Sequence, residues 1–355
     1  MTLSEYLEEK TTLLSRAGIP DAENEAWLCF MEGTGLSRSV IRFSLGNALS
    51  SVVSESSFGA LEEIFARRAE HEPLSYIVGH APFYDLTFSV GEGVLIPRFD
   101  TEILVETALG ALSFPQMLPG APQIPQVDGA SAPPQIPQMD GASAPPQMES
   151  HGGTERENRG DVVESRAVTI TDVATPIRIL DLCTGSGCVG ITIAHELQKK
   201  GLAYDLVMTE ISPKASAFAE ENAKAILGEG SWKVELADLW PESEDKYDLI
   251  VSNPPYVTKE EMTELLPEVS EYEPAMALTD EGDGLLFYRR IVEGLPRFLA
   301  PGGVLAVEHG CDQGEAVRDL MRPCLSGMLT VQDYGGRDRV TCGKCAASSS
   351  AGAGD

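Results

Sequence analysis

A glycine-rich segment at residues 181–187 (DLCTGSG) follows an apolar run that is typical of a strand and precedes a helical stretch. Glycines let the backbone approach a ligand closely at the start of a helix, and Asp181 adds a carboxylate that can accept hydrogen bonds. With Gly190 the segment spells G-x-G-x-x-G, and Glu210 ends the next apolar run, where an acid would bind ribose hydroxyls. The pattern predicts a nucleotide-like ligand and leaves NAD and S-adenosylmethionine open. A carboxylate at the strand tip favours the latter, which has a cationic amino-acid end.

A second segment, Asn253-Pro254-Pro255-Tyr256, follows the apolar run at 248–251. Two consecutive prolines fix φ twice, and Pro254 keeps Asn253 out of the helical region, so the corner is rigid. Such a corner can hold acceptors for the two N–H groups of a planar amino group, while Tyr256 can cover its face. The segment predicts a site that methylates an amide or amino nitrogen, with these four residues as the catalytic candidates.

The elements that must position these segments alternate along the chain. Four apolar runs are typical of strands: 177–180, 206–208, 248–251 and 304–308. Three longer segments are typical of helices: 189–199, 213–227 and 285–299, the last stopped by Pro301-Gly302-Gly303. Alternating strands and helices form a mostly parallel sheet that is covered on both faces and binds its ligand at the carboxyl ends of the strands. We therefore expect an α/β catalytic domain at 177–341 and a flexible tail at 342–355.

The first part of the chain has helical periodicity. Apolar side chains recur at helical spacing over residues 3–14, again from Asp21 towards Gly33, and over 58–68. These patterns predict a small helical domain at residues 1–79.

Residues 80–112 are expected to connect the helical domain to the catalytic domain. Two β-like runs, 83–90 and 94–96, are separated by Gly91-Glu92-Gly93, which predicts a β-hairpin. Residues 101–112 then predict the first helix of the catalytic domain, with Asp100 or Thr101 as its cap.

Between that helix and the first strand, residues 113–176 change character. The segment QIPQVDGASAPP at 123–134 recurs almost unchanged at 135–146. Two copies are too few for a solenoid, and Pro, Gly, Ala and Ser bury too little surface to offset the entropy of ordering. The sequence predicts a disordered insert that loops out without disturbing the sheet.

The overall composition excludes several classes of protein. The chain has 355 residues and 43% hydrophobic residues, enough for globular cores, and a formal net charge of −29 that repels nucleic acid. No secretory leader or run of 18 apolar residues is visible, which favours the cytoplasm and excludes a membrane span. Seven scattered cysteines form no disulfide framework, and Cys342-Gly-Lys-Cys345 has no second pair, so we expect no metal.

With both segments in hand, the chain outside the insert resembles the PrmC/HemK family. Residues 177–341 look like a class I S-adenosylmethionine-dependent methyltransferase, a Rossmann-like α/β fold, preceded by the family's helical domain. The resemblance extends over further stretches: 73–79 (PLSYIVG), 95–98 (LIPR) with Thr101-Glu102, 210–213 (EISP), Glu273-Pro274, 281–285 (EGDGL), 310–314 (GCDQG) and 335–340 (GGRDRV).

The family methylates N5 of the glutamine in the Gly-Gly-Gln motif of peptide-chain release factors, so the resemblance implies the same reaction, S-adenosyl-L-methionine as cofactor and a monomeric enzyme. It assigns the cofactor to Asp181, Cys183, Thr184, Gly185, Ser186, Gly187 and Asn253, its ribose to Glu210, its adenine to the region of Asp238 and Leu239, and the target glutamine to residues 253–256. Cys183 stands where relatives usually have glycine, Glu210 replaces the usual aspartate, and Leu239 stands where some carry an aromatic residue.

The main alternative is an adenine-N6 nucleic-acid methyltransferase, since an exocyclic amine presents the same planar NH2 to the same Asn-Pro-Pro-Tyr corner. Such an enzyme needs a basic channel for the flipped base, and no such channel is visible at this net charge. A dinucleotide-dependent oxidoreductase or an inactive cofactor-binding protein would leave that corner without a role. We therefore expect a release factor as partner, and neither nucleic acid nor membrane.

Overall fold

The computed structural model describes residues 1–112 and 175–345, which belong to one compact unit. The predicted insert at 113–176 lies outside the described residues except for its last two positions. The predicted tail at 342–355 lies outside them from residue 346 onward.

The region before the sheet is helical, as predicted, and has a hydrophobic core of its own. The three predicted helices are α1 (Leu3–Arg16), α2 (Ala22–Thr34) and α5 (Glu55–Ala69). Three shorter helices were not predicted: α3 (Arg38–Ser44), α4 (Leu49–Val52) and α6 (Leu74–Val78). Local capping fixes the starts of two long helices, because Thr2 and Glu5 form a capping box on α1 and Ser54 caps α5.

The β-hairpin lies earlier than the sequence predicts. Strands β1 (His80–Phe83) and β2 (Leu86–Ser89) pair antiparallel around a two-residue turn at Tyr84 and Asp85. The predicted strand pair at 83–90 and 94–96 is therefore wrong. The glycines at 91 and 93 predicted a turn there. The turn instead contains Tyr84, which has a φ of +59°.

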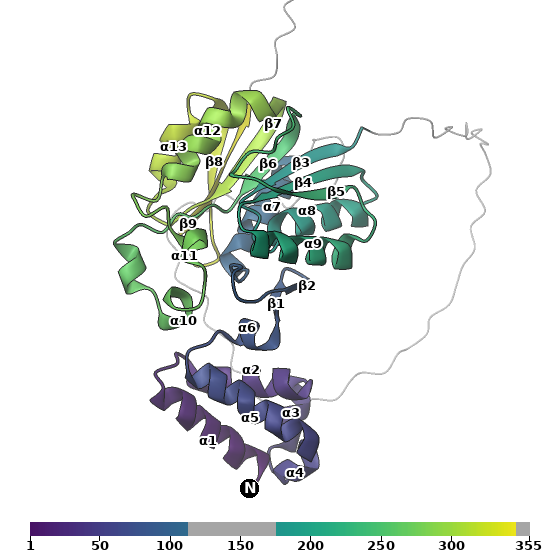
Figure 1. Ribbon diagram of the computed structural model, residues 1–355, viewed down its shortest axis with the longest axis vertical. Coiled ribbons are helices and arrows are strands. Elements are labelled where there is room, and N and C mark those ends of the chain that lie inside the picture. The colour runs from purple at the N-terminus through teal and green to yellow at the C-terminus, as the bar shows by residue number, and fades with distance from the viewer. Residues whose placement is uncertain (113–174, 346–355) are drawn as a thin grey trace, which may run out of the picture. The chain divides into compact units, whose positions relative to one another are not determined.

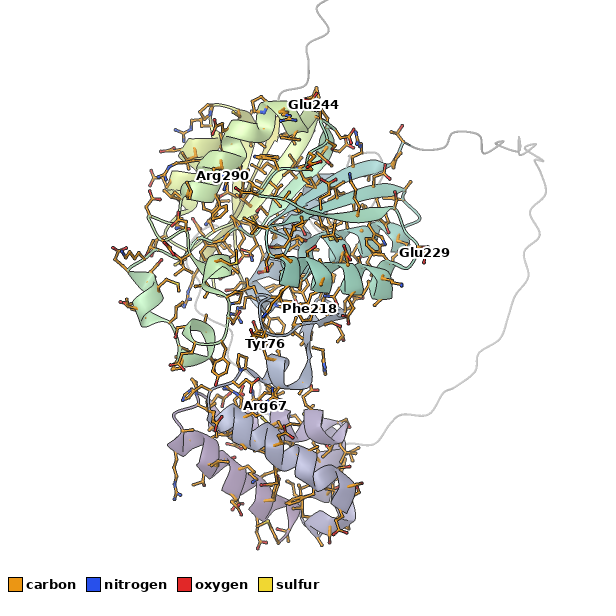
Figure 2. All side chains as sticks on the ribbon, viewed as in Figure 1. Arg67, Tyr76, Phe218, Glu229, Glu244 and Arg290 are labelled. Carbon is orange, nitrogen blue, oxygen red and sulfur yellow. The ribbon has the colours of Figure 1, made fainter. Side chains whose placement is uncertain are left out.

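Residues 93–98 form a loop that a small apolar cluster holds in place. Tyr76 on α6 donates a hydrogen bond to the Val94 carbonyl at 2.6 Å, and Val94 is buried beside Tyr76. Phe218, from a helix of the catalytic domain, packs against the same cluster (Figure 2). The loop is thereby fixed against the catalytic domain, where it lines the cavity described below.

The central sheet has seven strands in the order β5-β4-β3-β6-β7-β9-β8. β9 runs antiparallel to both of its neighbours, and the other recorded pairs are parallel, which confirms the predicted α/β class with a mostly parallel sheet. The strands are β3 (Ile177–Leu182), β4 (Tyr204–Glu210), β5 (Trp232–Leu236), β6 (Tyr247–Ser252), β7 (Leu299–Glu308), β8 (Leu325–Gln332) and β9 (Asp338–Cys345).

Helices cover both faces of this sheet (Figure 1). Strand residues alternate between two cores: Ile179 packs with one helix layer and Leu180 with the other, as the period of two in a strand requires. The first layer contains α7 (Glu102–Leu112), α8 (Cys188–Lys199) and α9 (Pro213–Leu227). The second layer contains α12 (Leu286–Phe298) and α13 (Gly314–Met321).

Short helical turns complete the described chain: η1 (Phe99–Thr101), η2 (Glu261–Glu264), α10 (Pro267–Ser270) and α11 (Ala275–Leu278). Arg68 on α5 is only 4% exposed and pairs with Glu25 on α2 at 2.8 Å and with Glu268 on α10 at 2.6 Å. This buried arginine joins the helical region to the loops that follow β6.

Two predictions near the end of the chain are corrected. β7 begins at Leu299 and continues through Pro301-Gly302-Gly303, because a register shift against β6 between Tyr247 and Leu249 absorbs the extra residues. β9 continues to Cys345, so the catalytic domain extends beyond the predicted end at 341, and Cys342 is buried in the sheet. Within the described residues, no helix is long and apolar enough to cross a membrane.

Candidate active site

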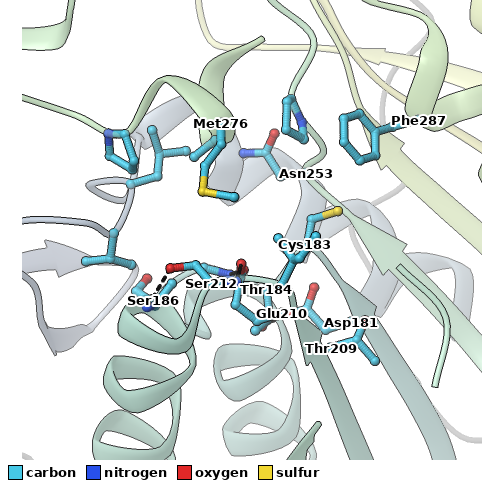
Figure 3. A pocket seen from close by; sticks show the side chains of 18 of the residues that line it. Asp181, Cys183, Thr184, Ser186, Thr209, Glu210, Ser212, Asn253, Met276 and Phe287 are labelled. Carbon is cyan, nitrogen blue, oxygen red and sulfur yellow. Dashed lines mark hydrogen bonds between the residues drawn. The ribbon is translucent and has the colours of Figure 1, made fainter. Parts of the chain in front are cut away.

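A cavity of about 330 Å³ opens at the carboxyl ends of the central strands. Its walls include residues that follow β3, β4, β5 and β6. Chain connections leave the β3 and β6 pair in opposite directions, which is the switch point where open α/β sheets bind ligands. Figure 3 shows Asn253 and Met276 on one side of the cavity, with Glu210, Ser212 and Ser186 across from them.

Asp181 connects the glycine loop to the helix that follows it. Its Oδ2 accepts a hydrogen bond from the Thr184 hydroxyl at 2.6 Å and from the Gly190 N–H at 2.9 Å. A Cβ at Gly190 would lie 2.8 Å from the same oxygen, so only glycine fits there. Burial raises the pKa of Asp181 to about 7, against the effect of those two hydrogen bonds. The carboxyl therefore holds the loop in shape while it lines the cavity.

The glycine loop turns by means of left-handed backbone at three positions: Cys183 and Gly185, each with a φ of +57°, and Gly187 with +83°. Of the predicted loop residues, five line the cavity: Asp181, Cys183, Thr184, Gly185 and Ser186. Gly187 is not among the lining residues. It is the N-cap of α8, and a Cβ there would meet Ile191.

Glu210 lies at the end of β4 and faces the cavity with 9% of its surface exposed. Its two carboxylate oxygens accept backbone N–H groups of Gly185 and Ser212, each at 2.9 Å. These bonds fix the carboxylate and leave it lone pairs for hydroxyl donors. Asp238 and Leu239 also line the cavity; Asp238 pairs with Arg290 at 2.9 Å, and Leu239 is buried with a φ of +74°.

The Asn-Pro-Pro-Tyr corner follows β6, and two of its residues, Asn253 and Pro255, line the cavity. The Asn253 Nδ2 donates to the Thr101 hydroxyl at 3.1 Å. Pro254 and Tyr256 are not among the lining residues. The Tyr256 hydroxyl instead contacts Glu308 on β7 at 3.4 Å, and burial raises its pKa well above the ordinary value. That Tyr256 covers a bound amino group stays a prediction.

Sequence reasoning missed one wall of the cavity. It is formed by residues 93–98 with Thr101, and by Met276 on α11 with residues 279–281. Glu273 joins these two segments, since its carboxylate accepts the Ile96 N–H at 3.2 Å and pairs with Arg98. Only parts of these segments, 95–98 with Thr101 and Glu281, belong to the stretches that resemble the family, and no periodicity or spacing placed them beside the glycine loop.

The cavity suits S-adenosylmethionine by the chemistry of its donors. The Glu210 carboxylate can bind a ribose diol, and the buried Ser186 hydroxyl makes no hydrogen bond in the structure. A Cβ at Gly185 would meet nothing within 4 Å, so the loop backbone is open to a ligand. Asp181 suits a cationic amino-acid end, and Leu239 and Met276 offer apolar contact to a flat base. Within the described residues, no group of three or more His, Cys, Asp or Glu side chains could hold a metal ion.

Comparison with known proteins gives matches along both parts of the chain. The methyltransferase small domain matches residues 167–291, and the PrmC N-terminal domain matches residues 5–79. A release factor glutamine methyltransferase of Geobacter sulfurreducens is 32% identical over 97% of this chain and 96% of its own length. One of Pasteurella multocida is 32% identical over 91% of each chain, and one of Fusobacterium nucleatum is 31% identical over 93% of this chain and 75% of its own.

The parallel sheet, the ligand cavity at its switch point and the near full-length relatives agree with one another. The part of the chain from β3 onward has the class I methyltransferase fold, whose cofactor is S-adenosylmethionine. The chain belongs to the family of release factor glutamine methyltransferases.

Proposed function

We propose that this enzyme transfers the methyl group of S-adenosylmethionine to the side-chain N5 of the glutamine in the Gly-Gly-Gln motif of peptide-chain release factors. The observation that supports this most directly is the position of Asn253. Its carboxamide lies on the wall of the same cavity as Glu210 and the glycine loop, so a substrate amide and the methyl donor can meet there. We propose Asn253 as the catalytic residue and Pro255 as part of the rigid corner that holds it.

Positioning is the main task of the protein in this reaction. An amide nitrogen is a poor nucleophile because its lone pair is delocalised into the carbonyl, the resonance behind a rotation barrier of ~18–20 kcal/mol in peptides. When bound, S-adenosylmethionine supplies a methyl group on a positively charged sulfur. The Asn253 oxygen would accept an N–H group of the substrate amide and favour a pyramidal nitrogen. Such positioning can lower a barrier by ~7–11 kcal/mol.

Histidine is not required as a base in this proposal. Neither His195 nor His309 is among the residues that line the cavity. His309 is fully buried, and its two ring nitrogens bond to the Gly310 carbonyl and the Thr341 hydroxyl, each at 2.9 Å. Burial lowers the pKa of His309, so the ring is neutral at pH 7. Its bond to Thr341 on β9 gives the ring a structural role in the sheet.

Charge around the cavity favours a protein substrate over a nucleic acid. Among the described residues that line the cavity, Arg98 is the one base, against five acids: Asp181, Glu210, Asp238, Asp280 and Glu281. Arg98 is itself paired with Glu273. A flipped adenine with its phosphates would meet no basic channel.

We further propose that the enzyme acts as a monomer that meets release factors transiently in the cytoplasm.

A labelling experiment tests this proposal. The enzyme is incubated with methyl-labelled S-adenosylmethionine and either purified release factor, the same release factor with its Gly-Gly-Gln glutamine replaced by alanine, or duplex DNA. We expect label only on the release factor that keeps its Gly-Gly-Gln glutamine. Asn253→Ala should abolish labelling and leave S-adenosylmethionine binding, measured by calorimetry, within a few-fold of wild type. Label on DNA, or full turnover by Asn253→Ala, would contradict the assignment.

A further inference from the structure

A half-buried glutamine outside the cavity is bonded to the end of the Asn-Pro-Pro-Tyr corner. Gln313 is the N-cap residue of α13 and is not among the residues that line the cavity. Its Nε2 donates a hydrogen bond to the Tyr256 carbonyl at 2.9 Å, and its Oε1 accepts the Gly310 N–H at 3.0 Å. The bond to Tyr256 joins residues 57 positions apart, and the reaction as described gives it no role.

These two bonds fix the orientation of the Gln313 carboxamide. An N–H group can only donate a hydrogen bond, and a carbonyl oxygen can only accept one. With the carboxamide turned over, its NH2 would face the Gly310 N–H and its oxygen would face the Tyr256 carbonyl. Both contacts would then be repulsive, so the side chain has one favourable orientation, with its NH2 group towards Tyr256.

The two prolines of the corner make it depend on a donor from outside. Proline has no N–H, so neither can donate a hydrogen bond that ties the corner to the rest of the fold. The backbone is instead held at the end of the corner, at the peptide unit between Tyr256 and Val257. Gln313 donates to its carbonyl, and its N–H donates to the carbonyl of Leu278, the last residue of α11, at 2.8 Å.

A third segment packs against the same peptide unit. Gly284, just before α12, has a φ of +71°. A Cβ at this position would lie 2.3 Å from the Tyr256 oxygen and 2.5 Å from the Gln313 Nε2. Both distances are far below a normal contact, so only glycine fits there. The peptide unit is therefore enclosed by α11, α13 and the segment before α12.

The cavity wall continues on both sides of this peptide unit. Asn253 and Pro255 precede it in the chain and line the cavity. Val257 pairs with Thr279 in an isolated parallel bridge, and residues 279–281 also line the cavity. A displacement of the peptide unit would therefore move the corner and the opposite segment together.

We propose that Gln313 is a positioning residue for the methylation reaction: it fixes the peptide unit that ends the Asn-Pro-Pro-Tyr corner, and so keeps the Asn253 side chain where the substrate amide must meet it. The inference rests on the proposed function of Asn253. Because Gln313 lies outside the cavity, it acts through the backbone of the corner and not by contact with the substrate.

A nearly isosteric substitution tests this role. Gln313→Glu keeps an acceptor for the Gly310 N–H but replaces the donor to Tyr256 with a carboxylate oxygen, which the carbonyl repels. We expect kcat for release factor methylation to fall by about tenfold or more, with the Kd for S-adenosylmethionine and the KM for release factor within about threefold of wild type. Gln198→Glu, the same change at an exposed position on α8, should leave all three unchanged.

A change on another side of the peptide unit provides the test if Gln313→Glu does not fold. Gly284→Ala forces a Cβ against the Tyr256 oxygen and should lower kcat in the same way. The matched control is Gly201→Ala, where φ is +69° and a Cβ would meet nothing within 4 Å, so it has the same backbone strain without the clash. The double variant Gln313→Glu/Gly284→Ala should be no worse than the poorer single variant within about twofold, since both displace one peptide unit.

Amide hydrogen exchange reports on this peptide unit without a release factor. The Val257 N–H should exchange about tenfold faster or more in Gln313→Glu and Gly284→Ala than in wild type, while the amides of β6 exchange at the wild-type rate. The Gln198→Glu and Gly201→Ala controls should show no change at Val257.

Three results would overturn the proposal: wild-type kcat in folded Gln313→Glu, additive losses in the double variant, or unchanged exchange of the Val257 N–H. Absence of methyl transfer to any release factor by the wild type, together with faster Val257 exchange in the two variants, would contradict the proposed function and still support the fixing of this peptide unit by Gln313.

Discussion

Cys183 shapes the cofactor loop through its backbone. Its φ of +57° is in the left-handed region, which costs a residue with a Cβ roughly 1–2 kcal/mol. Burial raises the pKa of its thiol well above the ordinary value, so the sulfur stays protonated and is a poor nucleophile at pH 7. The cysteine is therefore a strained substitute for glycine, not a reactive group.

A pair of variants isolates that strain. Cys183→Gly and Cys183→Ala both remove the thiol, but only glycine relieves the left-handed backbone. We expect the glycine variant to have a free energy of unfolding about 1 kcal/mol higher than the alanine variant, as measured by urea denaturation. Equal stabilities would show that the loop relaxes out of this conformation when the side chain is small.

At the scale of elements, the packing of α8 against β3 sets the depth of the cofactor loop. The two elements approach each other closely at Gly190, where a Cβ would lie 2.8 Å from the Asp181 carboxylate and 3.1 Å from the Leu206 side chain. The hydrogen bond from the Gly190 N–H to Asp181 fixes the first turn of the helix beneath the loop. Any separation of helix and strand would move the loop that lines the cavity.

Two glycine-to-alanine changes in helices test this packing. Gly190→Ala should destabilise the protein by about 1–3 kcal/mol through overpacking and should weaken S-adenosylmethionine binding. The matched control is Gly110→Ala on α7, where a Cβ would meet nothing within 4 Å. The higher helix propensity of alanine at position 110 should stabilise the protein by up to about 1 kcal/mol and leave S-adenosylmethionine binding unchanged. Thermal unfolding and calorimetry measure both, and a stabilising Gly190→Ala would refute the close contact.

For the whole molecule, two fully buried carboxyl groups link stability to pH. Burial raises the pKa of Asp181 and of Glu308 to about 7, from ordinary values of 3.8 and 4.5. Between those values the folded chain binds protons that the unfolded chain has released. The free energy of unfolding therefore decreases as the pH rises from about 4.5 to 7. Each unit by which a carboxyl pKa is raised contributes roughly 1.4 kcal/mol to the total decrease.

Urea denaturation at a series of pH values checks this expectation. The free energy of unfolding should fall between about pH 4.5 and 7, and Asp181→Asn and Glu308→Gln should each make the fall shallower. Carboxylates with lowered pKa, such as Asp333, lose their protons below this window and do not reverse the trend within it. Stability that increases over the window in the wild type would contradict the burial of both acids.

Much of the catalytic part could be predicted because its signals are local. The strand before Asp181, the helix at 213–227 and the rigid corner at Asn253 all follow from periodicity, glycine and proline. The sequence did not predict β5, β8 and β9, because pairing with neighbouring strands, rather than a pattern of residues within each strand, stabilises them. The hairpin was misplaced because Tyr84 adopts a turn conformation that its residue type does not favour.

The sequence by itself determined the fold class, the family and two of the segments that line the cavity, since each depends on residues close together in the chain. Only the tertiary structure decided that Asn253 and Pro255 line the cavity while Tyr256 does not, and that Thr101 accepts a hydrogen bond from Asn253. The hydrogen bond from Asn253 to Thr101 joins residues 152 positions apart. Contacts of that kind follow from how strands and helices pack together, which no local pattern of residues specifies.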